Sequence, residues 1–328
     1  TGNANAGTGE QGMQDALRSC ASLAGHAGVP AEAVLPFSTG VIGEPLPIDR
    51  IEAALPAALE DLSADGWARA ASGIMTTDTL PKGATRRVEI DGESVTLSGI
   101  SKGAGMIRPN MATMLAFVAT DAVIAPALMQ SLVAGATEQS FNRITIDGDT
   151  STNDACVGVA TGGSEAPEIT AGSQALGVFE SALNELFLEL AHAIVRDAEG
   201  ATKFVAVNVA GAARSEDALA VAYTVAESPL VKTALYASDP NWGRILAAVG
   251  RAGVSGLDVS QVSIHLGDVC IVRHGGRAAG YSEEMGQSVM DRPEIRISID
   301  LAMGEMSETV WSSDFSHEYV TIIAEYRT

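Results

Sequence analysis

The stretch Lys102-Gly-Ala-Gly-Met-Ile-Arg-Pro-Asn-Met-Ala-Thr-Met-Leu115 leads into a long apolar segment, Met114 to Ala136. A glycine-rich loop before a buried strand can hold a backbone carbonyl group and a hydroxyl group in a strained approach. An intramolecular attack of the Thr113 hydroxyl on the Ala112 carbonyl carbon would need that arrangement. The simpler interpretation, which the chemistry alone favours, is that Thr113 merely begins a strand.

The apolar segment is predicted to stay inside the protein. It contains Asp121, Pro126 and Gln130, which would be costly in a lipid bilayer. We therefore expect a buried strand followed by a helix, which Pro126 opens and which continues to about Phe141.

Upstream of the loop, apolar periodicity predicts a helix over Met13 to Ala24 and a second near Ile51 to Leu62, whose middle Pro56 disfavours. The Asp91-Gly92 pair within 87–97 predicts a β-hairpin with a type I′ turn. Downstream, Phe179 to Arg196 is the clearest amphipathic helix. Further strands are expected at 204–209, 262–266, 269–272, 294–301 and 308–313, and further helices at 215–227 and 242–251.

Strands and helices alternate irregularly in this prediction, so we expect a layered α/β fold rather than a Rossmann order. No GxGxxG or GxxxxGK[ST] pattern of a nucleotide site is present. The net charge of -21 argues against nucleic-acid and anionic-membrane partners. Three dispersed cysteines favour a reducing cytoplasm and give no zinc spacing. The start of the chain does not resemble a signal peptide.

The 102–115 stretch resembles the self-cleavage signature of the glutamate N-acetyltransferase, or ornithine acetyltransferase, family of arginine biosynthesis. Other segments resemble that family in the same order, so the resemblance covers essentially the whole chain. These segments are Thr1-Gly-Asn-Ala-Asn-Ala6, Ser38-Thr-Gly-Val-Ile-Gly43, Met75-Thr-Thr-Asp-Thr79, Asp147-Gly-Asp-Thr-Ser-Thr-Asn-Asp154, Glu199-Gly-Ala-Thr-Lys203, Asp239-Pro-Asn-Trp-Gly-Arg244 and the tail from Ser312 to Thr328.

The resemblance implies a layered α/β assembly, aminopeptidase-like in type, that cleaves itself between Ala112 and Thr113. The products would be an α chain, residues 1–112, and a β chain, residues 113–328, which stay associated in a higher oligomer. Thr113 would be the nucleophile, with its new α-amine, of pKa about 8, as the adjacent base. Acetyl would pass from N-acetylornithine to Thr113 and then to glutamate. Acetyl-CoA is a further possible donor, and no cofactor or metal is expected.

The resemblance also assigns binding roles residue by residue. Thr39 and Gly40 match the oxyanion-hole pair, although such a segment is otherwise a glycine-rich turn. Thr76 matches a substrate-binding position. Lys102 would pair with a substrate carboxylate, where the alternative is a solvated lysine.

The remaining assigned contacts lie later in the chain. Glu199 matches a binding glutamate suited to an ammonium group, and is otherwise an acid in a loop at a helix end. Thr113 itself also counts as a substrate contact. Thr328 matches a substrate-binding C-terminal residue, which requires the tail to fold back into the site.

The chain departs from the family pattern in two ways. Ile323 occupies a position where the family has a substrate-contacting Asn, and isoleucine cannot form that hydrogen bond. Family members also begin some tens of residues before Thr1, so we expect the α chain to be truncated.

Asp147, Asp149 and Asp154 lack the EF-hand pattern, so we expect them to form a turn network and no metal site.

Three other functions stay open from the sequence. A self-processing hydrolase or aminopeptidase of similar fold would let water take the acyl group. An inactive binding protein would need a broken nucleophile or oxyanion hole, and Thr113, Thr39 and Gly40 are present. A paralogue with altered amino-acid specificity is kept open by Ile323.

Overall fold

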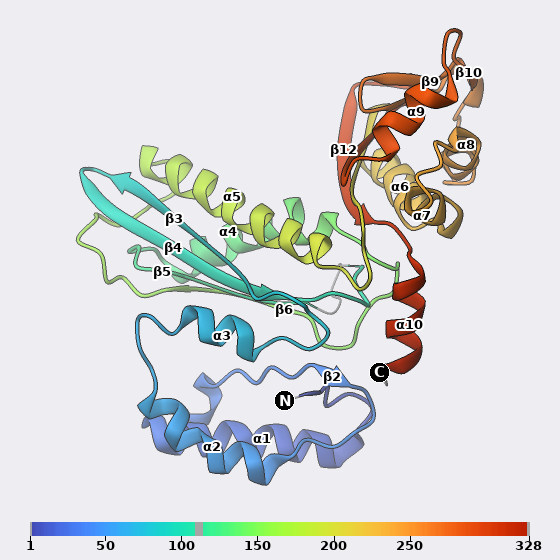
Figure 1. Cartoon of the computed structure of the whole chain (residues 1–328). Coiled ribbons are helices and arrows are strands. Elements are labelled where there is room, and N and C mark those ends of the chain that lie inside the picture. The colour runs from blue at the N-terminus through green and yellow to red at the C-terminus, as the bar shows by residue number, and fades with distance from the viewer. Residues whose placement is uncertain (1, 109–113, 327–328) are drawn as a thin grey trace.

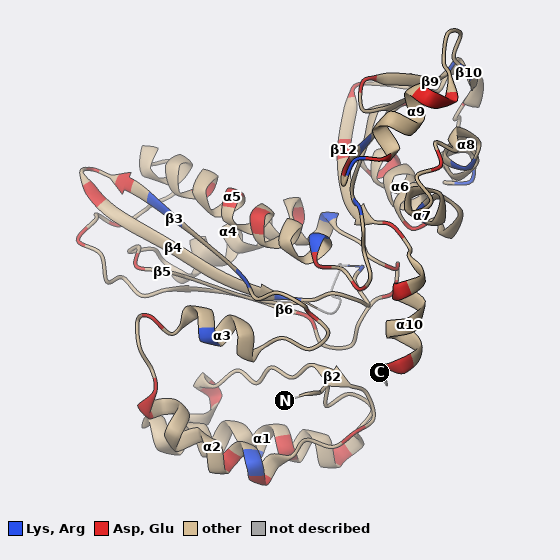
Figure 2. Ribbon diagram, in the orientation of Figure 1, with Lys and Arg blue, Asp and Glu red and all other residues tan. Residues whose placement is uncertain are grey.

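The computed structural model describes residues 2–108 and 114–326. Within this part of the chain, two sheets with their helices and a small N-terminal region make up the molecule (Figure 1). Each large sheet is packed against its own apolar core. Acidic side chains are spread over all parts, and Lys and Arg are fewer (Figure 2). The predicted layered α/β class is confirmed.

The four-stranded sheet has the order β3-β4-β5-β6, and its strand β5 begins two residues after Thr113 in the sequence. Its first pair is the predicted hairpin, with Asp91 and Gly92 at φ 50° and 88° as a type I′ turn requires. The central pair, β4 and β5, is antiparallel, and β6 pairs with β5 in parallel at the edge of the sheet. The strands are β3 Lys82–Ile90, β4 Glu93–Lys102, β5 Leu115–Thr120 and β6 Ala155–Ala160.

Two helices cover one face of this sheet, α4 (Pro126–Gln139) and α5 (Gln174–Arg196). Pro126 is the first residue of α4, as predicted, and the Ser173 hydroxyl caps α5 by accepting a hydrogen bond from Leu176 N. The apolar stripe of α5 is buried in the core between helices and sheet. These two helices therefore cover the face of the sheet that includes β4, the strand that ends at Lys102.

The six-stranded sheet forms the second lobe and has the order β10-β9-β8-β11-β7-β12. Two interior strands, β7 and β11, pair in parallel, and the other pairs are antiparallel. Alternate Val and Ile side chains bury one face under helices. The elements are β7 Phe204–Ala212, α6 Ser215–Ala226, α7 Pro229–Tyr236, α8 Trp242–Gly250, η3 Val259–Gln261, β8 Ser263–Leu266, β9 Val269–Arg273, β10 Gly276–Arg277, α9 Glu283–Met290, β11 Glu294–Asp300 and β12 Met306–Ser313.

The N-terminal region packs α1 (Gly9–Ala27) against α2 (Ile48–Glu60). The predicted second helix is confirmed, and Pro56, which disfavoured its middle, is accommodated inside a continuous α2. The short strands β1 and β2 pair in parallel, and α3 lies on the open face of the β3–β4 hairpin (Figure 1). The remaining elements are β1 Gly2–Asn3, η1 Ala31–Ala33, β2 Gly40–Val41, α3 Trp67–Gly73 and η2 Phe141–Arg143.

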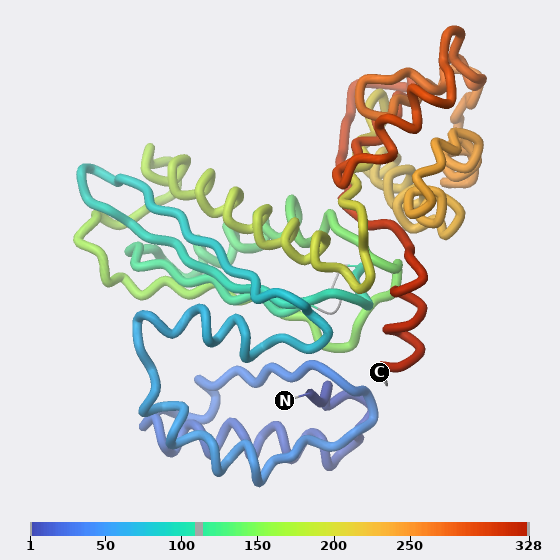
Figure 3. The backbone as a smooth tube through the Cα atoms, in the orientation of Figure 1, coloured from blue at the N-terminus to red at the C-terminus, as the bar shows by residue number. Residues whose placement is uncertain are grey.

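The last helix, α10 (His317–Glu325), leaves the second lobe after β12 and runs back beside the N-terminal region (Figure 3). Ser316 fixes its start, since the hydroxyl accepts from Tyr319 N and donates to Gly200 O. The role assigned to Thr328 requires the tail to fold back toward the site, and the tail does so as far as Tyr326, the last described residue. Among the described residues, no helix is long and apolar enough to cross a membrane.

Candidate active site

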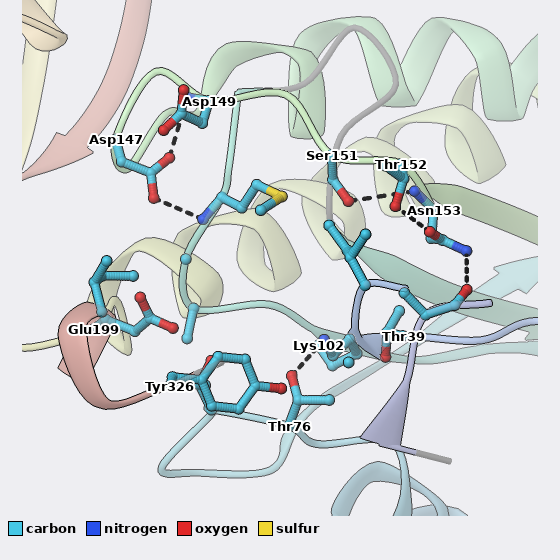
Figure 4. A pocket seen from close by; sticks show the side chains of 18 of the residues that line it. Thr39, Thr76, Lys102, Asp147, Asp149, Ser151, Thr152, Asn153, Glu199 and Tyr326 are labelled. Carbon is cyan, nitrogen blue, oxygen red and sulfur yellow. Dashed lines mark hydrogen bonds between the residues drawn. The ribbon is translucent and has the colours of Figure 1, made fainter. Parts of the chain in front are cut away.

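A pocket lies where the N-terminal region, the four-stranded sheet and α10 meet (Figure 4). It holds about 810 Å³ of empty space, counted out to its open mouth. Its walls come from segments that are far apart in the sequence. They are Ala4, Thr39, Gly40, Ile42, Thr76, Thr77, Lys102, Ala104, Gly105, Met106, Asp147, Asp149, Ser151, Thr152, Asn153, Glu199, Tyr319, Ile323 and Tyr326.

Lys102 is the last residue of β4 and contributes a buried cation to the pocket wall. Its residue surface is 2% exposed, so the alternative of a solvated lysine is wrong. Its Nζ donates to the Thr76 hydroxyl at 2.8 Å. Burial lowers the pKa of Lys102, and the Asp78 carboxylate is the strongest influence opposing that shift. A carboxylate entering the pocket would find this ammonium largely stripped of water.

Glu199 follows the end of α5 and faces the same pocket (Figure 4). It is 6% exposed, and its Oε2 atom is buried without a hydrogen-bond partner among the described residues. Burial raises the pKa of Glu199, and a hydrogen bond from Thr77 opposes the shift. Gly105 gives it room, because a Cβ there would lie 2.1 Å from Oε2. An incoming ammonium group would satisfy this oxygen.

Thr39 and Gly40 stand at the start of β2, where the wall approaches the N-terminal strand. Thr39 is buried, and Gly40 has φ 128°. A Cβ at position 40 would come within 2.2 Å of the Gly2 carbonyl group, so the close pairing of β1 and β2 requires glycine. Both residues line the pocket, and their oxyanion role stays a prediction.

The predicted turn network is present at Asp147, whereas Asp154 bonds to a distant peptide group. Asp147 accepts hydrogen bonds from the N–H groups of Met106 (2.6 Å) and Ile107 (3.0 Å), and from Asp149 N at 3.2 Å. This holds Met106 at φ 55°, a conformation that costs a non-glycine residue energy. No group of His, Cys, Asp or Glu in the described part of the chain is arranged to hold a metal.

Asp154 reaches the peptide group that opens β5. Its Oδ1 accepts from Met114 N at 2.6 Å. Burial raises the pKa of Asp154 to about 7, against the effects of that hydrogen bond and of the Lys102 charge. Asp154 therefore changes charge near neutral pH, and it does so while bonded to the N–H of Met114, the residue after Thr113.

The tail brings Ile323 to the pocket together with two tyrosines that the motifs did not indicate. Tyr319, Ile323 and Tyr326 all line the pocket, spaced four and three residues apart on one side of the chain. Helical spacing from Ile323 could have indicated the two tyrosines. The Ile323 side chain presents an apolar surface where the family pattern expects an amide.

The predicted site residues within the described part meet in one place, and three predictions lie outside it. Thr39, Gly40, Thr76, Lys102 and Glu199 line a single pocket. Ala112, Thr113 and Thr328, which were assigned to cleavage, catalysis and substrate binding, fall outside the described residues.

Comparisons with known proteins match the chain over residues 1–328 to the ArgJ family. The arginine biosynthesis bifunctional protein ArgJ of Pseudomonas syringae pv. tomato is 60% identical over 332 residues, covering 100% of this chain and 81% of that protein. The protein of the same name from Pseudomonas fluorescens is 59% identical, with the same coverage. That from Methylococcus capsulatus is 58% identical and is covered over 80% of its length.

A solved structure is also similar. The crystal structure of arginine biosynthesis bifunctional protein argJ from Bacillus halodurans superimposes with a TM-score of 0.61 at 38% identity. The match covers 64% of this chain and 98% of that chain. The family drawn from the motifs is thereby confirmed, and the chain belongs to the ArgJ family.

Proposed function

We propose that this protein transfers an acetyl group from N-acetylornithine to glutamate through an acetyl-Thr113 intermediate. The observation that carries the proposal is that one pocket holds both a buried cation, Lys102, and a buried carboxylate oxygen of Glu199 that finds no partner in the described part of the chain. Amino-acid substrates bring a carboxylate and an ammonium group, which complement these two side chains. The names of the relatives, which are arginine biosynthesis bifunctional proteins, agree with this chemistry.

The proposed cycle has two balanced steps. The Thr113 hydroxyl oxygen attacks the acetyl carbon of N-acetylornithine while its proton passes through the α-amine to the departing ornithine nitrogen. The glutamate amine then attacks the acetyl-threonine ester and returns a proton to the Thr113 oxygen. Thr39 and Gly40 would donate hydrogen bonds to the oxyanion in both steps, each worth about 3 kcal/mol of barrier.

The proposed mechanism requires cleavage between Ala112 and Thr113, since an internal threonine has no α-amine. We also propose that both fragments stay associated in a higher oligomer in the cytoplasm, need no cofactor, and accept acetyl-CoA as a second donor.

Intact-mass measurement of the freshly purified protein beside its Thr113→Ala variant tests the first requirement. Two fragments that divide after Ala112 are expected in the parent protein and one uncut chain in the variant. An uncut chain in both samples would overturn the N-terminal-threonine mechanism.

Acetyl exchange is then measured with labelled N-acetylornithine, with and without glutamate. Transfer of label to glutamate is expected, with little release as free acetate. Acetate release that glutamate does not suppress would instead support a self-processing hydrolase.

A further inference from the structure

Asp78 joins the two loops that hold Lys102 in place. Its Oδ1 atom accepts from Gly103 N at 2.7 Å, so it holds the residue directly after Lys102. Its Oδ2 atom accepts from the N–H of Thr76 at 3.1 Å. Since the Thr76 hydroxyl accepts from Lys102 Nζ, one carboxylate orders both the backbone and the hydrogen-bond partner of the ammonium.

Asp78 belongs to a buried, charge-balanced cluster behind the pocket. Lys82 Nζ donates to Asp78 Oδ1 at 2.6 Å and also to Asp197. Asp197 in turn accepts from the N–H groups of Thr79 (3.0 Å) and Leu80 (3.2 Å). Two carboxylates thus share Lys82, which leaves one negative charge that a second buried cation can balance. Lys102 is the buried cation beside them.

The charged groups that act on Lys102 are Asp78, Lys82, Asp154 and Glu199, taken in order of their effect on its pKa. Burial raises the pKa of both Asp154 and Glu199, so these two acids are the ones more readily neutralised. Burial acts on Asp78 in the same direction, but the Lys82 charge, the Gly103 N–H and Lys102 outweigh it and lower its pKa. Asp78 therefore remains an anion when the other two carboxylates take up protons.

We propose that Asp78 is a positioning residue that keeps Lys102 both aimed into the pocket and protonated, so that Lys102 can bind the carboxylate of an amino-acid substrate. This inference rests on the proposed function for the identity of the substrate. The contacts of Asp78 with Gly103, Thr76 and Lys82, all within the described part of the chain, carry the rest.

The test compares Asp78→Asn with the parent protein across pH. Substrate binding through Lys102 is present below the Lys102 pKa and is lost as pH rises through it. Asp78 is the anion with the largest effect on Lys102, so removing it lowers that pKa, and the alkaline limb of kcat/KM for glutamate should move to lower pH by about one unit or more. Acidification should restore much of the lost activity.

Asp197→Asn is the matched control, because it removes the other carboxylate bound to Lys82. Its bonds go to Thr79, Leu80 and Lys82, so it should lower the melting temperature and leave the alkaline limb in place. Asp78→Glu, which keeps the charge, should also leave the limb in place. The proposal is overturned if Asp78→Asn lowers kcat/KM equally at every pH, or if Asp197→Asn shifts the limb as far.

A measurement without substrate separates this inference from the proposed function. The Lys102 ammonium is titrated by NMR in protein carrying 13C-labelled lysine, with Lys102→Met to assign the signal. The Lys102 pKa should fall in Asp78→Asn even if no acetyl exchange is found in the parent protein, and an unchanged pKa sinks the proposal.

If the single variant does not fold, Lys82→Met/Asp78→Asn is titrated in the same way. The effect of Asp78 on the Lys102 pKa is the larger of the two, so this pKa should still fall. An unchanged or raised value would contradict the proposal.

Discussion

The pocket end of the four-stranded sheet and the six-stranded lobe both bury charged side chains. They differ in whether those charged groups find hydrogen-bond partners inside the protein. At the pocket, Glu199 keeps a buried oxygen that has no partner within residues 2–108 and 114–326, and Lys102 bonds to a threonine hydroxyl. In the second lobe, the fully buried Lys232 donates to the Ser312 hydroxyl and the Ser313 carbonyl and lies 4.5 Å from the centre of the Phe315 ring. A buried charge with bonding capacity left over indicates a binding site, and one with its bonds satisfied indicates a structural role.

The largest expected effect separates these two lysines directly. Lys102→Met should lower kcat/KM for glutamate by about 100-fold, because a charge-assisted hydrogen bond to substrate is worth about 1.5–3 kcal/mol. Its melting temperature should hold or rise, since the cost of burying a cation is removed. Steady-state kinetics and thermal unfolding measure both. A loss of stability as large as that of a core variant would show that Lys102 has a structural role, as Lys232 does.

Several residues that line the pocket were predictable from the sequence, but their environments were not. The motifs indicated Lys102 and Glu199 through their neighbours, and the hairpin and α5 followed from local periodicity. The burial of both charges depends on residues more than 20 positions away, such as Asp78 for Lys102, which no local pattern relates to it. The short helix α7 also escaped prediction, although it begins with Pro229. Its eight residues give too little periodicity.

The second prediction concerns Lys232 in the six-stranded lobe. Lys232→Met should lower the free energy of unfolding by about 1–3 kcal/mol, because two buried oxygen acceptors lose their donor. The kcat of acetyl exchange should change less than threefold, roughly within 1 kcal/mol. Chemical denaturation and kinetics at 25 °C give the two values. A large loss of kcat with intact stability would place Lys232 in the catalytic machinery instead.

Lys232 also predicts a pH dependence of stability. Burial lowers the pKa of Lys232 to about 7, below its usual value near 10.5. Between these pH values the unfolded chain binds the additional proton, so this group makes stability rise with pH from about 7 to 10. Denaturation curves should show that contribution in the parent protein and its loss in Lys232→Met. Identical slopes in the two proteins would contradict the prediction.

A smaller effect is expected from filling the space beside Glu199. Gly105→Ala places a Cβ where Oε2 lies, so the carboxylate must turn away, and kcat/KM should fall by about tenfold, or roughly 1.4 kcal/mol. Gly135→Ala is the matched control, since that exposed glycine in α4 has nothing within 4 Å of the new atom. The control should gain about 1 kcal/mol of stability without losing activity. Equal losses of kcat/KM in both variants would show that Gly105 does not provide the space that the Glu199 carboxylate needs.

The smallest effect is expected at Ile323, on the helix that connects the two regions. α10 starts after β12 in the second lobe and brings Ile323 into the pocket wall, where the side chain is 39% exposed. Partial exposure limits the gain from a new hydrogen bond to about 1 kcal/mol, so Ile323→Asn should lower the KM for the amino-acid substrate about fivefold with kcat unchanged. Ile323→Leu, which keeps the apolar wall, serves as the control. The opposite outcome is a higher KM in Ile323→Asn together with lost binding of a more apolar acceptor. That outcome would show that Ile323 selects a different substrate. The wall formed by α10 would then determine specificity, while the buried charges supply affinity.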